Sequence, residues 1–359
     1  MSEEHSTAEN NAVTYQCPAC GGSLEFSPKD SSLKCPYCGN TVAVEKDTNI
    51  EERDLVLHAS ESEAWKDDAS VYTCPNCGSS QVFEKGEISM KCPFCGTTTV
   101  MEANNLPGIK PDSLLPFSLS KADAEKIFQV WAKSRKFLPK AMKTAFNSES
   151  YKGIYLPVWT FDDSTTSSYD GKLGKHYTVT VGSGKNRRTE TRTRYFHVSG
   201  TDSNFFDDVK VNGSDKISEK TLNKIEPFDT KSGVKYDKKF LAGFSAALYT
   251  KDLKTAWAEA KEKITAAIRK KILSKYDYDV VSYLNINTTH KDMTFKYMLF
   301  PVWISCFKFK DKVYNFFVNG TNGKITGKRP YSALKILAAV GIGIATVALI
   351  ALIIWLLTK

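Results

Sequence analysis

The chain has 359 residues, and about 330 of them precede its last apolar segment, so we expect two or three domains with room for a sizeable core. Lys and Arg number 49 against 40 Asp and Glu, and the resulting net charge of +9 is modest for this length. Such a charge permits contact with an anionic membrane or a nucleic acid and requires neither, so composition excludes a single small domain without selecting a partner.

Eight of the nine cysteines form two modules near the N-terminus, at residues 14–47 and 71–103. Residues 1–13, which precede the first module, are polar and are expected to be disordered. Each module contains two CPxCG half-sites with 14 residues between the inner cysteines. This repeated spacing indicates metal binding in a reducing compartment rather than disulfides. The candidate metal ligands are Cys17, Cys20, Cys35, Cys38, Cys74, Cys77, Cys92 and Cys95.

The CPxCG pattern suits the binding of one metal ion by two thiolates from a tight turn. Proline after the first cysteine fixes the backbone angle φ, and glycine after the second permits a left-handed conformation that turns N–H groups toward the sulfur atoms. Each module is therefore predicted to be a zinc ribbon, a small antiparallel sheet held by a tetrahedral four-thiolate zinc. The short strands are predicted at 23–26, 32–34 and 41–44 in the first module and at 81–84 and 88–91 in the second.

Four protein ligands leave no open coordination position, so we expect two structural Zn2+ ions rather than catalytic ones. A redox role for the CxxC pairs would need a thioredoxin-like βαβ context, which the sequence lacks. Zinc ribbons are commonly associated with nucleic acids, but here acidic residues are mixed with lysines around both modules, without a basic stripe. We therefore favour protein binding and keep nucleic-acid binding as the alternative.

The segment 48–70 between the modules is rich in Glu, Asp and Lys and is predicted to be a linker with a short helix. The body of the protein, residues 104–331, begins with a proline-rich connector at 104–116. Ser120 and Asp123 then resemble a capping box that opens a helix. The apolar residues that share one face of this helix, and that we assign to the core, are Ala124, Ile127, Phe128 and Trp131.

The body contains an internal repeat, because Pro-Val-Trp at 157–159 recurs at 301–303 and both segments continue into strand-like hairpins. This predicts a duplicated α+β body with an antiparallel sheet, in which each unit is a helix followed by a strand whose proline marks an edge or a bulge. We interpret Pro-Val-Trp as a buried structural corner rather than a binding motif. Cys306 alternates with apolar strand residues and is expected to be a buried thiol.

An inserted hairpin at 178–198 gives the first unit a basic strand. Three interpretations of its segment 185–194 stay open, in this order: a charged edge that resists aggregation, a contact with anionic lipid, and a nucleic-acid contact. The arginines of this hairpin are Arg187, Arg188, Arg192 and Arg194. A later helix is predicted to begin near Asp252, with one apolar face formed by Trp257, Ala260, Ile264, Ile268 and Ile272.

The sequence shows no fingerprint of a serine hydrolase, a zinc protease, a kinase or a dinucleotide-binding enzyme, so we predict that the protein is not an enzyme. The aspartate doublets at 162–163 and 207–208 are expected to point adjacent carboxylates to opposite faces of a strand, which makes them poor acid–base pairs. His176 and His197 are expected on hairpin strands, with no cysteine nucleophile or metal partner evident in the sequence.

The last apolar segment, 336–357, contains no charged residue and would extend roughly 33 Å as a helix, enough to cross a bilayer core of about 30 Å. We therefore predict a transmembrane tail anchor at 332–359. Lys and Arg are concentrated before this segment and only Lys359 follows it, which predicts a cytoplasmic N-terminal bulk. No apolar run precedes it, so we expect no signal peptide and a single-pass protein of the plasma (inner) membrane.

The CPxCG modules, the two Pro-Val-Trp segments, the stretch 237–257 and the tail anchor together resemble bacterial double-zinc-ribbon membrane proteins with TFIIB-type zinc ribbons. Some members of that family are encoded beside SPFH-domain (flotillin-like) and PspA-type proteins. The resemblance implies a membrane-anchored adaptor that recruits such a cytosolic scaffold in bacterial envelope stress, with the eight cysteines as zinc ligands. It identifies no docking surface, and a membrane-tethered nucleic-acid-binding protein is the alternative.

Overall fold

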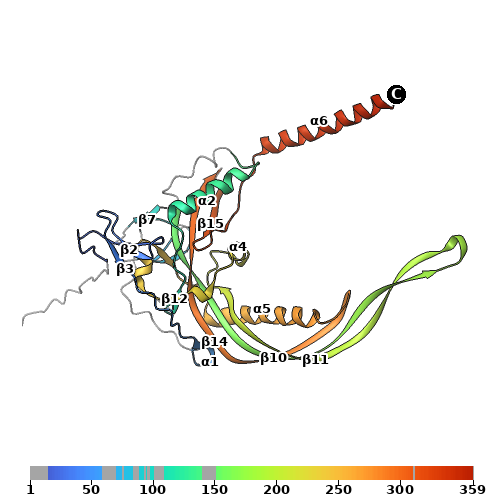
Figure 1. Cartoon of the computed structure of the whole chain (residues 1–359), viewed down its shortest axis with the longest axis horizontal. Helices are drawn as coiled ribbons and strands as arrows, with labels where there is room; N and C mark the ends of the chain where they lie inside the picture. Colours follow the sequence, from blue (N-terminus) through green and yellow to red (C-terminus); the bar gives the residue numbers. More distant parts are fainter. Residues whose placement is uncertain are drawn as a thin grey trace, which may run out of the picture.

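The computed structural model describes residues 15–58, 70–74, 77–83, 89–92, 94, 98–100, 109–139, 151–309 and 312–358. These residues form an α+β protein built on one large mixed sheet, with an apolar helix at its C-terminal end (Figure 1). The predicted tail at 1–13, part of the linker at 48–70, part of the connector at 104–116 and the ligand Cys95 lie outside the described residues.

Two long antiparallel strands, β10 (Tyr151–Val181) and β14 (Val280–Phe309), form the middle of the large sheet. The order across the sheet is β12–β9–β14–β10–β13–β6–β5, while β11 (Arg188–Asn212) pairs with β10 and β15 (Lys312–Asn319) pairs with β14. β9 runs parallel to β14, and β13 runs parallel to β10. The sheet is therefore mixed, whereas the sequence predicted an antiparallel one. The short strands are β4 (Arg53–Asp54), β5 (Ser70–Thr73), β6 (Ser80–Phe83), β9 (Ser113–Leu114), β12 (Val234–Lys235), β13 (Ser245–Ala247) and β16 (Ile325–Gly327).

The two predicted helices of the body are present, and the first has the predicted cap. The Ser120 side chain accepts from the Asp123 N–H, and the Asp123 carboxylate accepts from the Ser120 N–H, so the capping box is confirmed. Asp252 caps the second helix by accepting from the Thr255 N–H. The helices are α1 (Leu55–His58), α2 (Lys121–Ser134), α4 (Glu219–Ile225) and α5 (Leu253–Leu273), and the short 3-10 turns are η2 (Gly184–Asn186), η3 (Thr230–Ser232) and η4 (Lys238–Leu241).

The helices bury the faces that their sequence periodicity indicates. On α2, Ala124 and Phe128 are fully buried, and Ile127 and Trp131 pack against the edge of the same core. On α5 the buried stripe lies against the curved sheet, mainly over β11 and β10 (Figure 1). The members of the predicted α5 face that are buried are Ala260, Ile264, Ile268 and Ile272, and Trp257 is partly buried.

The Pro-Val-Trp segments lie in the centre of the sheet, and not at an edge or a bulge as predicted. Pro157 pairs with Leu299, and its carbonyl accepts from the Gly213 N–H. The N and C=O of one strand residue point to the same side, so the nitrogen of Pro157 faces the gap between the end of β13 at Ala247 and the end of β11 at Asn212. No described strand residue lies in this gap to accept a hydrogen bond, so the missing N–H of proline leaves no acceptor unpaired. Pro301 lies in the equivalent gap between β9 and β15, which is how two central strands tolerate proline.

The tryptophans of both segments are buried, as predicted, and make contacts of the same form. The Trp159 indole N–H donates to the Lys251 carbonyl, and the Trp303 indole N–H donates to the Leu119 carbonyl, each at 3.0 Å. Each acceptor immediately precedes the N-cap residue of a helix, α5 in one case and α2 in the other. Cys306, by contrast, is only half-buried, because it lies where β14 approaches its end.

The first cysteine module forms its own small sheet, whereas the second is divided. β1 (Glu25–Ser27), β2 (Ser32–Lys34) and β3 (Thr41–Ala43) pair antiparallel, as predicted. In the second module, β6 pairs with β5 and with β13 of the body, so these strands extend the large sheet. β7 (Ser89–Lys91) and β8 (Thr98–Val100) pair only with each other among the described residues.

The C-terminal helix α6 (Ala333–Leu357) has 25 residues and is long and apolar enough to cross a membrane. None of its residues is buried within the described part of the chain. It projects away from the body, to which it is attached by bonds from the Ser332 N–H to the Phe137 carbonyl and from Lys335 Nζ to the Leu138 carbonyl (Figure 1).

Candidate metal centres

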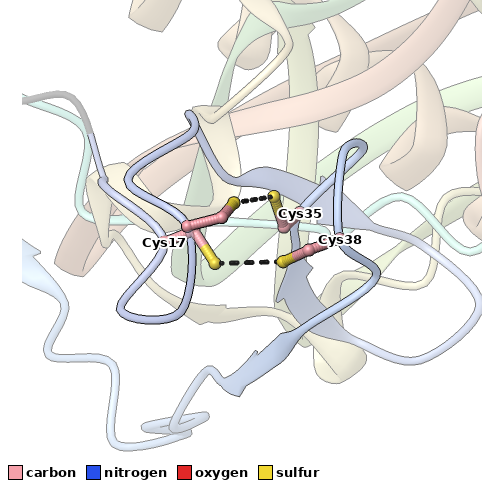
Figure 2. A group of neighbouring side chains, drawn as sticks. Cys17, Cys35 and Cys38 are labelled. Carbon is pink, nitrogen blue, oxygen red and sulfur yellow. Dashed lines mark hydrogen bonds between the residues drawn. The ribbon is translucent and has the colours of Figure 1, made fainter.

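The four cysteines of the first module converge, and Figure 2 shows three of them, Cys17, Cys35 and Cys38, pointing toward one another from two loops. The Cys17 and Cys38 sulfurs lie 3.5 Å apart, as do the Cys20 and Cys35 sulfurs, and all four lie within 4.8 Å of one another. Thiolates bound to one zinc at about 2.3 Å stand about 3.8 Å apart in a tetrahedron. The four predicted ligands therefore have nearly the separation that a zinc ion requires.

The backbone of each half-site holds its thiols in place with the same two hydrogen bonds. The Gly21 N–H donates to the Cys17 carbonyl at 2.8 Å, and the Cys17 N–H donates to the Gly22 carbonyl at 2.7 Å. The half-site that begins at Cys35 repeats both bonds. Gly21 and Gly39 have φ of 72° and 76°, a left-handed conformation that favours glycine, so the role predicted for the glycine of CPxCG is confirmed at these positions.

The pKa values of the thiols at this site are shifted in opposite directions. Burial acts to raise the pKa of Cys17, but N–H groups of Ala19 and Cys20 outweigh it and lower this pKa to about 6. The N–H of Gly22 acts to lower the pKa of Cys20, but hydrogen bonds with the Cys38 and Cys35 thiols raise it to about 12. Without a metal, the group therefore retains protons that a cation has to displace, which makes metal affinity depend on pH.

The first module is docked on the body through Phe26. Its ring is 4% exposed and lies 5.1 Å from the Phe240 ring and 6.4 Å from the Phe244 ring, measured between centroids. The Phe26 N–H also donates to the Ala242 carbonyl at 3.0 Å. Folding of this module thus covers an apolar surface of the body.

Three of the four predicted ligands of the second site belong to the described residues. Cys74, Cys77 and Cys92 bring their sulfurs within 4.8 Å of one another, and Cys77 and Cys92 are 3.7 Å apart. Gly78 has a φ of 64°, like the glycines of the first site. The buried Ser79 hydroxyl lies 3.4 Å from the Cys92 sulfur and 3.2 Å from that of Cys77. This group could also hold a metal, and zinc suits its thiol donors.

A third cluster contradicts the expectation for the aspartate doublet at 207–208. Asp162, Asp207 and Asp208 bring carboxylate oxygens within 4.8 Å of one another, although neighbouring strand residues were expected to face apart. The cause is local: Asp208 has a φ of 53°, and the register of β10 and β11 shifts at this point. Lys296 Nζ lies 2.9 Å from Asp208 and 2.7 Å from Glu52, so the cluster is part of an ion-pair network.

The carboxyl groups of this network differ in acidity. Burial raises the pKa of Asp162 to about 6. Burial also acts to raise the pKa of Asp208, but hydrogen bonds from Thr230 and Lys296 outweigh it and hold this pKa below its usual range. Burial acts to lower the pKa of Lys296, whereas its bonds to Glu52 and Asp208 raise it. Lys296 therefore remains charged and neutralises part of the cluster.

The contact between His290 and Asp163 was not predicted from the sequence. His290 Nδ1 lies 2.6 Å from a carboxylate oxygen of Asp163, a fully buried residue whose pKa is raised by burial. No spacing or periodic pattern in the sequence links these two residues, which are 127 positions apart. His176 lies on the exposed hairpin, where its Nδ1 is 3.0 Å from the Thr193 hydroxyl, and His197 is exposed on β11.

Comparisons with known proteins add a relative without a described activity. No family model matches the chain, and no solved structure matches it. A similar protein is the uncharacterised protein YdjG of Bacillus subtilis (strain 168), with 28% identity over 328 residues that cover 91% of this chain and 92% of YdjG. The similarity therefore extends over almost the full length of both proteins.

Proposed function

We propose that the protein is a non-enzymatic, membrane-anchored adaptor. It binds a cytosolic protein through its zinc-ribbon modules and its body and holds that partner at the inner face of the plasma membrane. The partner class that we infer is an SPFH (flotillin-like) or PspA-type scaffold in bacterial envelope stress. This choice of partner rests on the resemblance of the motifs to double-zinc-ribbon membrane proteins.

The observation that carries the proposal is the exposure of α6. This helix has 25 residues, and none of them is buried in the described part of the chain. An uncovered apolar helix of this length is unfavourable in water and suits the hydrocarbon core of a bilayer. Basic residues precede it at 324–335, which favours a cytoplasmic body.

The first module supports a role in binding a protein. Four thiol ligands leave no position open for a substrate, so a metal there serves folding and not catalysis. Tyr37, next to the ligand Cys38, is 81% exposed. Exposed aromatic side chains on a rigid loop are typical anchors of protein interfaces. We therefore infer that Tyr37 contacts the partner.

Crosslinking in membranes followed by purification of the full chain tests the proposal, with mass spectrometry to identify the partner. Deleting residues 333–359 should release both the chain and its partner into the soluble fraction. Tyr37→Ala should reduce co-purification of the partner, while Tyr283→Ala, at a tyrosine 40% exposed on β14, should not. A partner that remains on the membrane after the deletion contradicts recruitment by this protein.

We also infer that the body consists of two copies of one unit, each with a short strand, a helix and a long strand carrying Pro-Val-Trp. In support, β10 and β14 pair with Leu156 opposite Phe300, the two residues that precede these motifs. The tryptophan of each unit binds the carbonyl before the helix of the other unit, as described above. Equal effects of the substitutions Trp159→Phe and Trp303→Phe on stability are expected from this arrangement.

A membrane-tethered nucleic-acid-binding protein is the second candidate, and the observation that favours it is the group of arginines at 187–194. Binding of this kind weakens steeply with salt, because each neutralised phosphate releases counterions. Retention of oligonucleotides by the full chain, measured over a range of salt concentrations, decides between the two. Absence of retention at low salt removes this candidate.

A further inference from the structure

The end of the β10–β11 hairpin is a two-stranded arm. β14 accompanies β10 only as far as Gly174, and beyond it the arm consists of 175–181, the turn and 188–194 (Figure 1). A two-stranded ribbon without a third strand or a covering helix is only marginally stable in water. The arm is therefore a segment that a surface outside the protein could stabilise.

The register of the arm divides its side chains into two unlike faces. Residues directly opposite each other in an antiparallel pair point to the same face. The pairs Lys175↔Arg194, Tyr177↔Arg192, Val179↔Glu190 and Val181↔Arg188 therefore share one face, which we call the arginine face. The opposite face carries the pairs His176↔Thr193, Thr178↔Thr191 and Thr180↔Thr189. The charged strand residues of the arm thus lie together, and the other face is mainly threonine.

The arginine face retains excess positive charge after its internal ion pairs are counted. Glu190 is its one carboxylate, and it lies 2.9 Å from Arg188 and 3.4 Å from Arg192. The side chains of these two arginines are nevertheless 76% and 54% exposed. Arg194 lies over the Tyr177 ring at 5.6 Å. At the base of the arm, Lys175 is balanced by Asp277 and Asp279, so the excess charge lies toward the tip.

We propose that the arginine face docks on the anionic phospholipid headgroups of the bilayer that α6 enters. The arginines match phosphate groups in charge and hydrogen-bonding geometry. Tyr177, Val179 and Val181 lie on the same face, opposite the arginine-bearing strand, and such a mixture of a tyrosine with aliphatic side chains suits the boundary of headgroups and acyl chains. A nucleic acid offers the same phosphates but gives these valines no apolar environment.

The two ends of this attachment lie on one chain. In Figure 1, α6 and the hairpin project from the body toward the same side of the view. Once α6 is inserted, the arm is held near the lipid surface, and its binding becomes an intramolecular step with a high effective concentration. The inference rests on the proposed anchoring of α6. It adds a second contact that fixes how the body faces the membrane.

Hydrogen exchange of the full chain in lipid nanodiscs tests this inference. One set of discs contains phosphatidylcholine alone, and the other also contains phosphatidylglycerol. Exchange of the amides at 175–194 should slow by about tenfold or more in the anionic discs only. The variant Arg188→Gln/Arg192→Gln/Arg194→Gln should lose this protection. A control with the same loss of charge, Lys220→Gln/Lys224→Gln/Lys254→Gln on exposed positions of α4 and α5, should keep it.

Each outcome of the experiment has a separate meaning. Equal exchange in both types of disc, from a chain that is retained in the discs, overturns the arm's role and leaves the anchor intact. A chain that is not retained in discs overturns the anchor and the inference with it. Slowing that appears only when a DNA duplex is added assigns the arginine face to nucleic acid instead. Protection that the triple Arg variant keeps also overturns the proposal.

Discussion

Replacing Cys35 by Ser removes one sulfur from the first candidate zinc site. Cys35 is 1% exposed and lies 3.5 Å from the Cys20 sulfur, so its loss opens the coordination shell at a position that the surrounding chain does not easily refill. Serine is a poor zinc ligand at neutral pH because its hydroxyl remains protonated. We expect the zinc content of the purified full chain to fall from two ions to about one.

The loss should unfold the first module and leave the body folded. Zinc binding to four thiolates contributes on the order of 10 kcal/mol, whereas the module itself has strands of three residues each and a few buried side chains. The body has separate clusters of buried residues around β10 and β14. Limited proteolysis should therefore cut within 15–47 in the variant and spare the region 151–309.

The assay is metal analysis of the wild type and two variants, purified without chelators. Cys306→Ser is the matched control, because Cys306 is the cysteine that belongs to neither CPxCG module. It should retain both zinc ions. If Cys35→Ser also retains two zinc ions, or if the control loses one, the assignment of ligands is wrong. A wild-type chain that binds no zinc would refute the reasoning as a whole.

Three other predictions follow from single contacts. Phe26→Ala should undock the first module without loss of zinc and lower the free energy of unfolding by about 3–5 kcal/mol, measured by denaturant titration. Tyr37→Ala, at an exposed position, should change the free energy of unfolding by less than about 0.5 kcal/mol. Asp162 has a pKa raised from 3.8 to about 6, so the native state binds its proton more tightly than the unfolded state and loses stability as pH rises from about 4 to 6. Asp162→Asn should remove this pH dependence and be up to about 3 kcal/mol more stable than the wild type above pH 6. A pH profile of stability that the substitution leaves unchanged would contradict the assignment. Trp159→Phe and Trp303→Phe should each cost about 1 kcal/mol for the lost indole hydrogen bond, and a large difference between their melting curves would argue against equivalent environments.

The features that the sequence predicted correctly are those that depend on residues close together in the chain. The capping box of α2 joins residues three positions apart, and its geometry is as expected. The CPxCG half-sites form tight turns whose bonds span a few residues, and Gly21 and Gly39 have the expected backbone angles. The apolar face of α5 and the long apolar helix α6 follow from periodicity and length alone.

The errors occurred where a residue's neighbours come from distant parts of the chain. The segment 104–116 was predicted only as a proline-rich connector, yet β9 lies within it, because two residues suffice for a strand when β14 and β12 supply the partners. β6 was assigned to a separate ribbon, yet it pairs with β13 of the body. Short strands carry too few residues for a periodic signal, so only the assembled sheet identifies them.

The chemistry of the body was likewise decided by the tertiary structure. His290 and Asp163 are 127 positions apart and meet because β10 and β14 pair in one register. Asp162 and Asp208 come together through a backbone twist that no sequence pattern reveals. The sequence alone determined the candidate metal-binding half-sites, the helices α2 and α5 and the terminal apolar segment, because these depend on local geometry and composition. Pairing of distant strands decided the mixed sheet, the ion-pair network and the arginine face, because register fixes which side chains share a face.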